Sequence, residues 1–205
     1  MGDVRWLLFD VGGVLCTADD ERWPEEFGTR WARYLGLSQS DFDARVTAAD
    51  LPDASIHEGV EGEFWSRYGG AVGATAEVIE AMRADFWDRY CGQANEELIQ
   101  FAMSLRGKVG LAILSNSGDG AREQEDRRFA FSNLFDPICY SHEIGVTKPH
   151  PDAFRSALRA MHASAESVVF IDNIAENVAA AEQLGLKCVH HRGNASTIAA
   201  LETFL

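Results

Sequence analysis

Short apolar runs rich in β-forming residues recur along the chain, each followed by a turn and a segment with helical periodicity. The apolar runs are residues 4–10, 109–114, 137–140, 168–172 and 187–191. The amphipathic segments of the second half are residues 95–107, 121–135, 151–163 and 176–185. Such runs are typical of buried parallel strands. Their alternation with helices predicts an α/β fold with a doubly wound, Rossmann-like parallel sheet.

The interval 17–92 breaks this alternation, because it carries helical periodicity without a convincing strand. Helices are predicted at 21–36, 38–50, 60–70 and 74–92. We therefore predict an α/β core domain of residues 1–16 and 93–205 and an inserted α-helical cap domain of residues 17–92. Ligands of doubly wound folds bind beyond the carboxyl ends of the strands. An insertion after the first strand is thus expected to lie over the pocket as a lid.

The charge balance limits the partners that a chain of this kind can have. Among its 205 residues, 18 Lys and Arg stand against 32 Asp and Glu, a formal charge of -14. Such a chain has no basic field to attract nucleic acid or an anionic membrane surface. No apolar run approaches the roughly 18 residues that span a bilayer. An anionic substrate is therefore expected to be small and held by a few local cations and amides.

The cysteines indicate a reducing compartment. Cys16, Cys91, Cys139 and Cys188 lie far apart and form no C-x-x-C pair. No basic segment followed by an apolar run opens the chain. We expect a cytoplasmic protein in which these residues act as small buried hydrophobes.

The first candidate motif is LLFDVGGVL, in which an apolar strand ends in Asp10 and runs into Gly12 and Gly13. A carboxylate at this place points into the crevice of the sheet. The glycines let backbone N–H groups approach a ligand closely, as in an anion-binding nest. The simpler interpretation is an Asp that ends a strand and starts a turn.

Two further motifs supply donors. In LAILSNSGDG, another apolar strand ends in Ser115 and Asn116 before a turn and a helix, where a hydroxyl and backbone amides can bind an anion. In GVTKPHPDAF, Lys148 precedes two prolines that stiffen its loop, which fixes the position of its charge. Taken singly, the first is typical of a helix cap and the second of a solvated surface lysine.

The fourth motif is VVFIDNIAEN, a buried strand that ends in Asp172 and Asn173. Oxygen ligands at a strand end suit a hard cation such as Mg²⁺. Helix capping is the competing interpretation. All four motifs follow predicted parallel strands or their connections, so we expect them to converge on one crevice.

The order of these motifs resembles that of the haloacid dehalogenase-like hydrolase superfamily. The matching residues are D-x-x-G-V-L, then L-S-N, K-P-x-P-x-x-F, F-I-D-N-x-x-E-N and A-A-x-x-L-G. The resemblance covers residues 4–191. The helical insertion after the first motif is similar to the small cap of one of its subfamilies, which includes the phosphatase-like N-terminal domains of epoxide hydrolases.

The resemblance implies a hydrolase and a role for each motif. Asp10 matches the nucleophile that forms a covalent aspartyl intermediate. Ser115 and Lys148 match the residues that hold the transferred group. Mg²⁺ is implied as cofactor, with Asp10, the carbonyl of Gly12 and a side chain of the fourth motif as ligands. A Mg²⁺-dependent phosphatase of a small phosphorylated metabolite is the function that follows.

Two departures from the family pattern weaken that expectation. Phosphatases of the superfamily carry a second Asp two residues after the nucleophile as general acid and base, and here Gly12 stands there. A missing acid–base group typically lowers the rate by about 10²- to 10⁴-fold. Asn173 follows Asp172 where paired Asp residues are frequent. If the amide of Asn173 is the ligand, Mg²⁺ binds more weakly, although Asp172 can substitute for it by a small shift.

These departures leave two alternatives to the phosphatase. A metal-independent 2-haloacid dehalogenase needs no proton for its halide leaving group, but the dehalogenases that the chain resembles carry Tyr at the position of Gly12 and a serine-rich fourth motif. A non-catalytic member can bind a phosphorylated ligand or a protein in the same crevice. The sequence leaves the oligomeric state open. It predicts a solvated face for the charged helix at 121–131.

Overall fold

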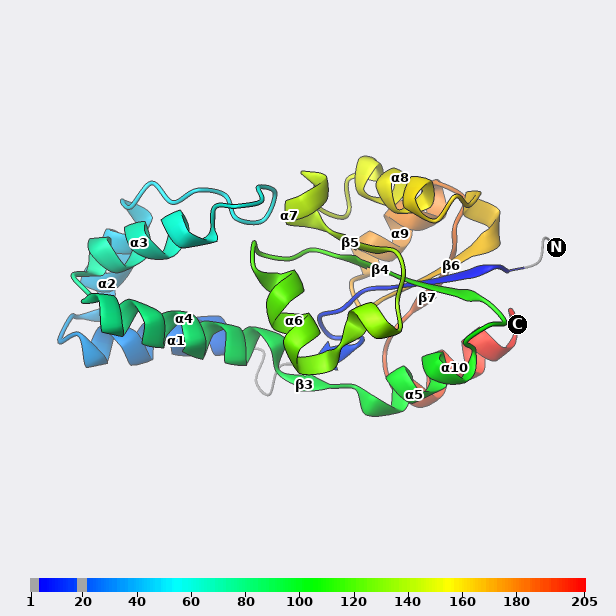
Figure 1. Ribbon diagram of the computed structural model, residues 1–205, viewed down its shortest axis with the longest axis horizontal. Helices are drawn as coiled ribbons and strands as arrows, with labels where there is room; N and C mark the ends of the chain where they lie inside the picture. Colours follow the sequence, from blue (N-terminus) through cyan, green and yellow to red (C-terminus); the bar gives the residue numbers. More distant parts are fainter. Residues whose placement is uncertain (1–3, 18–21) are drawn as a thin grey trace.

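The computed structural model describes residues 4–17 and 22–205. Within them, a five-stranded sheet has the order β5-β4-β1-β6-β7, and each neighbouring pair is parallel (Figure 1). Its strands are β1 (Trp6–Phe9), β4 (Gly110–Ser115), β5 (Ile138–Tyr140), β6 (Val168–Asp172) and β7 (Lys187–His190). The predicted α/β fold with a Rossmann-like sheet is confirmed, and β1 lies at its centre.

Helices cover both faces of this sheet. The helices of this part of the chain are α5 (Glu96–Ser104), α6 (Ala121–Phe129), α7 (Ser141–Ile144), α8 (Pro151–Ala160), α9 (Ala175–Gln183) and α10 (Asn194–Glu202). The core cluster on one face includes residues of α5 and α10, and the cluster on the other includes residues of α8 and α9. Figure 1 shows these two pairs on opposite sides of the sheet.

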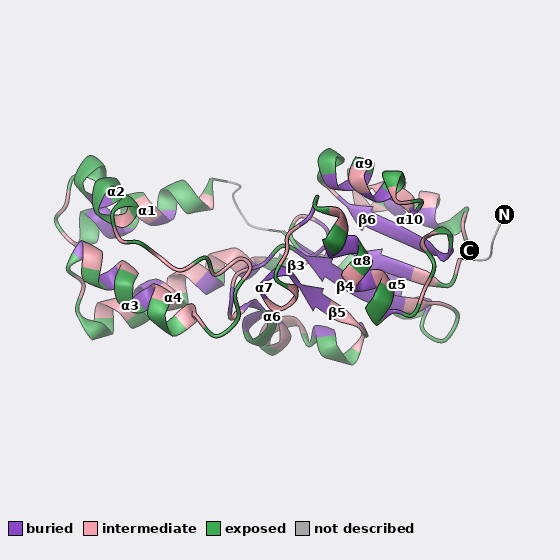
Figure 2. Ribbon diagram, turned by 90° about the horizontal axis from the view of Figure 1, so that it is seen from above, coloured by how far each residue is buried: buried purple, intermediate pink, exposed green. Residues whose placement is uncertain are grey.

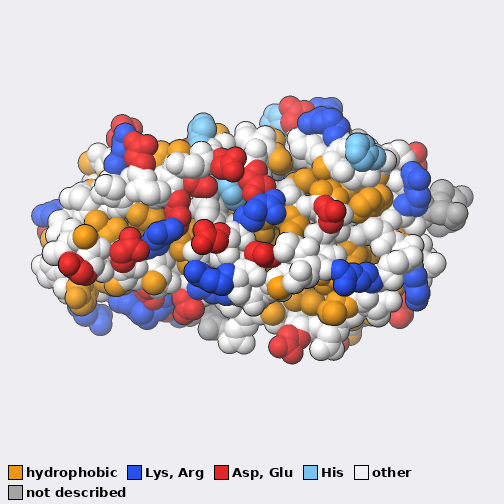
Figure 3. Space-filling view, in the orientation of Figure 1, with side chains coloured by type: hydrophobic (Ala, Val, Ile, Leu, Met, Phe, Trp, Pro, Cys, Tyr) orange, Lys and Arg blue, Asp and Glu red, His pale blue; other side chains and the backbone are white. Residues whose placement is uncertain are grey.

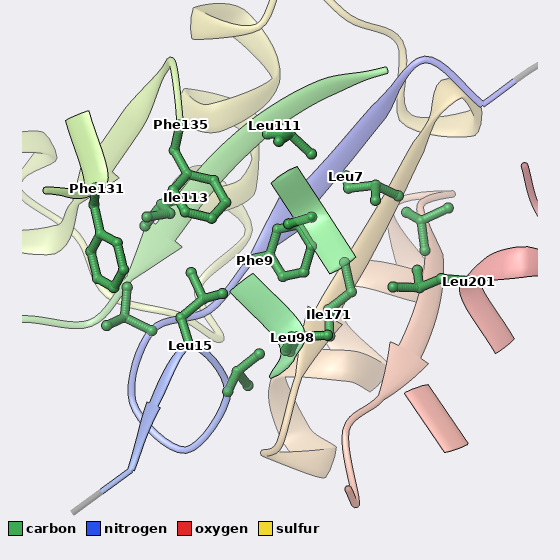
Figure 4. Packing of buried hydrophobic residues seen from close by; sticks show 14 of the residues in the cluster. Leu7, Phe9, Leu15, Leu98, Leu111, Ile113, Phe131, Phe135, Ile171 and Leu201 are labelled. Atoms are coloured by element: carbon green, nitrogen blue, oxygen red, sulfur yellow. The ribbon is translucent and has the colours of Figure 1, made fainter. Parts of the chain in front are cut away.

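The core follows from the two-residue periodicity of a strand. Leu7 and Phe9 of β1 pack with Ile113 and Ile171 under α5 and α10 (Figure 4), whereas Leu8 packs on the opposite face. All five side chains are fully buried. Burying an apolar side chain of this size contributes about 1.5–3 kcal/mol. The sheet is therefore a rigid support for residues at its carboxyl edge.

The helices between β2 and β3 pack mainly on one another. They are α1 (Trp23–Tyr34), α2 (Gln39–Thr47), α3 (Glu61–Val72) and α4 (Ala76–Cys91), which we call the helical insertion. Its buried centre is largely aromatic and contains Phe27, Trp31, Phe42, Trp65 and Met82. Figure 2 shows it beside the buried sheet of the core. Each of these helices was predicted, with boundaries shifted by a few residues; residues 18–21 of the predicted insertion and residues 1–3 of the predicted core lie outside the described residues.

A two-stranded ribbon joins the two parts and was not predicted. Strand β2 (Cys16–Thr17) pairs antiparallel with β3 (Gln93–Ala94), so the chain leaves and re-enters the core at neighbouring points. Strands of two residues carry no periodicity that a sequence pattern can reveal. Helices α7 and α10 were also missed. The segment predicted as one helix at 121–135 ends earlier, because Ala130 adopts a left-handed conformation with φ 52 and a 3-10 turn (Phe131–Asn133) follows.

The surface agrees with the charge balance of the sequence. On the face shown in Figure 3, acidic and basic side chains are interspersed, and no continuous basic surface covers that face. Across the described ranges, the structure contains no helix with the length and apolar character needed to span a membrane.

Candidate active site

Three charged side chains meet at the carboxyl edge of the sheet. The Nζ atom of Lys148 donates to Oδ1 of Asp10 at 2.6 Å and to Oδ2 of Asp172 at 2.8 Å. Asp10 follows β1 and Asp172 ends the neighbouring strand β6, so the register of the sheet places both carboxylates side by side. The exposed fractions are 7% for Asp10, 3% for Lys148 and 0% for Asp172. Lys148 is therefore not the solvated lysine that its residue type alone suggests.

Asp172 is held by donors on both of its oxygens. Oδ1 accepts from the backbone N–H of Ile174 at 2.7 Å, and Oδ2 accepts from Nδ2 of Asn177 at 3.0 Å in addition to Lys148. These contacts fix the carboxylate between the ammonium group and the first turn of α9. Asp172 thus orients Lys148. Of the two predicted metal ligands at this strand end, Asn173 is the one whose side-chain oxygen accepts no hydrogen bond from the described residues.

The backbone of Lys148 is held by Asn116. Nδ2 of Asn116 donates to the carbonyl of Lys148 at 2.8 Å, and Oδ1 accepts from the N–H of Lys148 at 2.7 Å. Asn116 was predicted to bind substrate. In the structure both polar atoms of its side chain are used on the lysine loop, so its contribution to the site is the position of Lys148.

The site contains more negative than positive side chains. Two carboxylates share one ammonium group. Burial raises the pKa of Asp10 above its ordinary value; the nearby Lys148 lowers this pKa, and the charge of Asp172 raises it further. An anionic group that approaches Asp10 therefore needs additional positive charge or donors.

Gly13 is required by the local backbone. Its φ is +78, and a Cβ added there would lie 2.3 Å from Nδ2 of Asn173. Its N–H donates to the carbonyl of Cys16 at 2.7 Å. The expected anion-binding role of this amide does not hold in this conformation, because the turn itself uses the donor.

Gly12 differs from Gly13 in both respects. Its φ lies outside the left-handed region, and apart from Gly12 and its two chain neighbours no atom of the described residues lies within 4 Å of a Cβ built at this position. Gly12 is exposed next to the buried Asp10. The position that the family pattern gives to an acid–base residue is thus open space in this protein.

Ser115 ends β4 beside β1 and is 2% exposed. Its hydroxyl makes one long contact, to the carbonyl of Asn116 at 3.4 Å. A hydroxyl held this weakly can rotate toward a ligand without losing a strong bond. Its predicted role as a donor to substrate stays a prediction.

Asn173 carries an unmet acceptor. Its Oδ1 atom is buried without a hydrogen-bond partner among the described residues, whereas its backbone carbonyl contacts Nε2 of His190 at 3.0 Å. A buried carbonyl oxygen without a donor is unfavourable, and a cation would satisfy it. Within residues 4–17 and 22–205, no group of three or more His, Cys, Asp or Glu is placed to hold a metal ion. A cation here would therefore rely on Asp10, the Gly12 carbonyl and the Asn173 amide, a donor set that suits Mg²⁺.

Glu125 is a buried acid that the sequence analysis did not identify. Helix α6 was predicted as solvated, yet Glu125 is 1% exposed and accepts from the hydroxyl of Tyr140. Burial raises the pKa of Glu125 to about 8; the Tyr140 hydrogen bond lowers it, and the charge of Asp10 raises it again. The spacing of Ala121, Glu125 and Phe129, one every four residues, is the signal that places Glu125 on the inner side of this helix.

Solved structures share this architecture. A haloacid dehalogenase family enzyme from Bacteroides thetaiotaomicron superposes with a TM-score of 0.74 at 21% identity, over 92% of this chain and 93% of that one. Another structure of that enzyme, in complex with magnesium and inorganic phosphate, gives a TM-score of 0.70 at 21% identity, over 91% and 93%. A 2-haloacid dehalogenase from Pseudomonas syringae pv. Tomato gives 0.68 at 16% identity, over 98% and 97%. At these identities the likeness shows the fold.

Sequence comparison points the same way. The bifunctional epoxide hydrolase 2 of Mus musculus is 26% identical over 113 residues, which is 53% of this chain and 20% of the relative. This chain thus matches about a fifth of the length of that relative. The model of the haloacid dehalogenase-like hydrolases matches residues 4–185. With this match, and with Lys148 donating to both Asp10 and Asp172 at the edge of a parallel sheet, the chain belongs to the haloacid dehalogenase-like hydrolases.

Proposed function

We propose that this protein is a phosphatase that hydrolyses a small phosphorylated metabolite through a covalent acyl phosphate formed on Asp10. The observation that carries the proposal is the ammonium group of Lys148, bonded at once to Asp10 and to the fully buried Asp172. A carboxylate that attacks a phosphate must overcome like-charge repulsion, and a fixed cation between two acids is suited to offset it.

In the first step, an oxygen of Asp10 forms a bond to phosphorus, and the bond from phosphorus to the leaving oxygen breaks. Lys148 stays in contact with Asp10 and the transferring group, because Asp172 and Asn116 hold its side chain and its backbone. The weakly bonded hydroxyl of Ser115 is available to donate to a phosphate oxygen. The leaving oxygen departs with the electron pair of the broken bond.

Gly12 restricts which leaving groups depart readily. No side chain at position 12 can donate a proton to the leaving oxygen, and the space there is open to water. Substrates whose leaving oxygen needs little protonation, such as acyl or anomeric phosphates, fit this site best.

In the second step, a water molecule attacks phosphorus, the bond to Asp10 breaks, and inorganic phosphate leaves. The proton of that water passes to solvent or to phosphate itself, since position 12 carries no base. Asp10 returns as a carboxylate bonded to Lys148. The proposal thus predicts slow hydrolysis of the covalent intermediate relative to a family member with an acid–base group.

We infer that Mg²⁺ is the cofactor. Asp10, the Gly12 carbonyl and Asn173 would hold it, and its charge would offset that of the phosphate. The unmet buried oxygen of Asn173 supports this assignment. The Bacteroides thetaiotaomicron enzyme of the same fold was solved with magnesium and phosphate.

We further infer that the helical insertion acts as the cap domain over the site, with 1–16 and 93–205 as the core domain and 17–92 as the cap. The cap limits the size of the substrate, so a small metabolite is the expected partner. The four free cysteines favour a cytoplasmic location.

A 2-haloacid dehalogenase is the second candidate. The observation that favours it is the open position 12, since a halide leaves without a proton. The unmet acceptor of Asn173 speaks against it, because a metal-independent reaction leaves that oxygen without a partner. The third candidate is a non-catalytic protein of this fold that binds a phosphorylated ligand.

The experiment that separates these functions is a paired assay. Release of phosphate from acetyl phosphate, an anomeric sugar phosphate and an alkyl phosphate is measured with Mg²⁺ and with chelator, beside chloride release from 2-chloropropionate. Asp10→Asn is the test variant, and Asp152→Asn, on the exposed first turn of α8, is the matched control. The proposal requires Mg²⁺-dependent phosphate release that Asp10→Asn abolishes and Asp152→Asn retains. Chelator-resistant chloride release would favour the dehalogenase, and neither product would favour the binding protein.

A further inference from the structure

The helical insertion contacts the core in more than one place: Trp87 of α4 packs with Ala121 and Tyr140 of the core, and a small polar patch lies at the connection between α2 and α3. Ser141 of α7 donates its hydroxyl to the carbonyl of Ser55 at 2.7 Å, and the N–H of Asp119 donates to the carbonyl of Ala54 at 2.8 Å. Ala54 and Ser55 belong to the connection between α2 and α3. Both contacts are backbone-directed, so they depend on the path of this connection and not on its side chains.

The strongest contact of the patch is made by the carboxylate of Asp119. Its Oδ2 accepts from the N–H of Val60 at 2.6 Å and from the N–H of Glu61 at 2.7 Å, at the start of α3. These N–H groups lack partners within their helix, and a carboxylate at a helix N-terminus also interacts favourably with the helix dipole. Asp119 is 8% exposed, which strengthens both effects.

Glu61, whose N–H is bound by Asp119, also connects α3 to α4. Glu61 accepts from Nη2 of Arg83 at 2.6 Å and from Nε1 of Trp87 at 2.7 Å, which join α3 to α4. Gly120, next to Asp119, leaves room for this approach: a Cβ there would lie 2.9 Å from Cδ of Glu61 and 2.9 Å from Cζ2 of Trp87. Its φ of +99 also favours glycine.

The same short loop holds the catalytic lysine. The side chain of Asn116 is hydrogen-bonded to the backbone of Lys148. Asp119, three residues later, accepts a hydrogen bond from the N–H of Val60 in the insertion. Between them, the N–H of Ser117 donates to Oγ of Ser141 at 2.9 Å. One segment of the core therefore connects the position of Lys148 with the position of the insertion.

We infer that Asp119 is a positioning residue, which holds the helical insertion closed on the core by accepting from the first N–H groups of α3. Removing its carboxylate frees these N–H groups and lets the insertion open more often. Substrate then binds to a closed form that is less populated, which raises KM. Because a bound substrate favours closure again, kcat changes less.

The test is amide hydrogen exchange of the full chain, followed in segment 54–61. Asp119→Ala is expected to accelerate exchange there by about ten- to a hundredfold, the loss typical of hydrogen bonds to a charged group. Segment 168–183 of the core is expected to keep its exchange rates. Asp126→Asn is the matched control, because its Oδ1 accepts from the N–H of Ser132 at 2.8 Å within the core.

If Asp119→Ala does not fold, Asp119→Asn and Ser141→Ala provide the same comparison with smaller changes. Unchanged exchange in segment 54–61 of a folded Asp119 variant would overturn the inference. A kinetic arm rests on the proposed phosphatase function: KM is expected to rise about tenfold while kcat stays within about threefold. Absence of activity in the parent protein would remove the proposed function and leave the exchange result standing. A fall in kcat alone, with KM unchanged, would contradict the role assigned to Asp119.

Discussion

The side chain of Asn116 pairs with the backbone of Lys148 as a neighbouring strand would, donating to its carbonyl at 2.8 Å and accepting from its N–H at 2.7 Å. The loop that bears the lysine has no strand neighbour of its own at this point. Asn116 therefore fixes the backbone of Lys148, while Asp10 and Asp172 accept hydrogen bonds from its ammonium group.

Asn116→Ala is expected to lower kcat by about ten- to a hundredfold with a small change in KM, because a displaced Lys148 weakens stabilisation of the transferring group. Steady-state kinetics on acetyl phosphate measure this. Asn194→Ala is the control, since it removes an amide contact to Asn95, away from the lysine. Equal losses in both variants would show that Asn116 acts through general stability.

Gly12→Asp is expected to raise kcat/KM on alkyl phosphates by about ten- to a hundredfold and to leave acyl phosphates nearly unchanged. The space at position 12 is open and its backbone needs no glycine, so the side chain can be added without strain. The ratio of the two rates is the measurement. A folded variant with an unchanged ratio would contradict the account of Gly12 as a missing acid.

Gly13→Ala is expected to be harmful, in contrast to the tolerated substitution at Gly12. Its φ of +78 and the Cβ position 2.3 Å from Nδ2 of Asn173 predict loss of activity and of stability. Thermal unfolding and phosphate release check this. A variant as stable and active as the parent would show that the loop has room to move.

Glu125 predicts how stability depends on pH. The pKa of its carboxyl is raised from 4.5 to about 8 in the folded chain, so the folded state retains a proton that the unfolded state releases. This contribution to stability is complete below about pH 4.5 and is lost as pH rises to about 8, at up to about 1.4 kcal/mol per pH unit. Glu125→Gln is expected to flatten the slope in that window. The free energy of unfolding from urea titrations at several pH values tests this, with Glu123→Gln on the exposed side of α6 as control. Equal slopes in parent and Glu125→Gln would contradict it.

Asn173→Asp is expected to tighten Mg²⁺ binding by about tenfold, because a carboxylate is a stronger ligand than an amide for a hard cation. Titration of activity with Mg²⁺, or calorimetry, gives the constant. Asn133→Asp adds the same charge at an exposed site of the 3-10 turn and serves as control. An unchanged constant in Asn173→Asp would place the cation elsewhere.

The sequence predicted the sheet and the residues at its carboxyl edge, because both follow from short-range patterns. Apolar runs bounded by turns reveal strands, and polar residues directly after them, such as Asp10, Ser115 and Asp172, fall at one edge of a parallel sheet. The same patterns revealed the four helices of the insertion.

What the sequence did not reveal depends on contacts between distant segments. Asn116 was expected to touch substrate, and its partner turned out to be the backbone of Lys148, 32 positions away. Glu125 looks solvated until Tyr140 and the neighbouring strands cover it. Asp119 meets the first N–H groups of α3 across 59 and 58 positions of the sequence. Local propensity carries no information on such pairs.

The most direct test of the central claim is to trap phosphate on Asp10. The protein is mixed with ³²P-labelled acetyl phosphate and Mg²⁺, quenched with acid within milliseconds and digested. The account predicts label on the peptide that contains Asp10, its loss during a chase with unlabelled substrate, and no label in Asp10→Asn. Rapid release of phosphate with no label on that peptide at any time would contradict the account, because water would then attack the substrate directly.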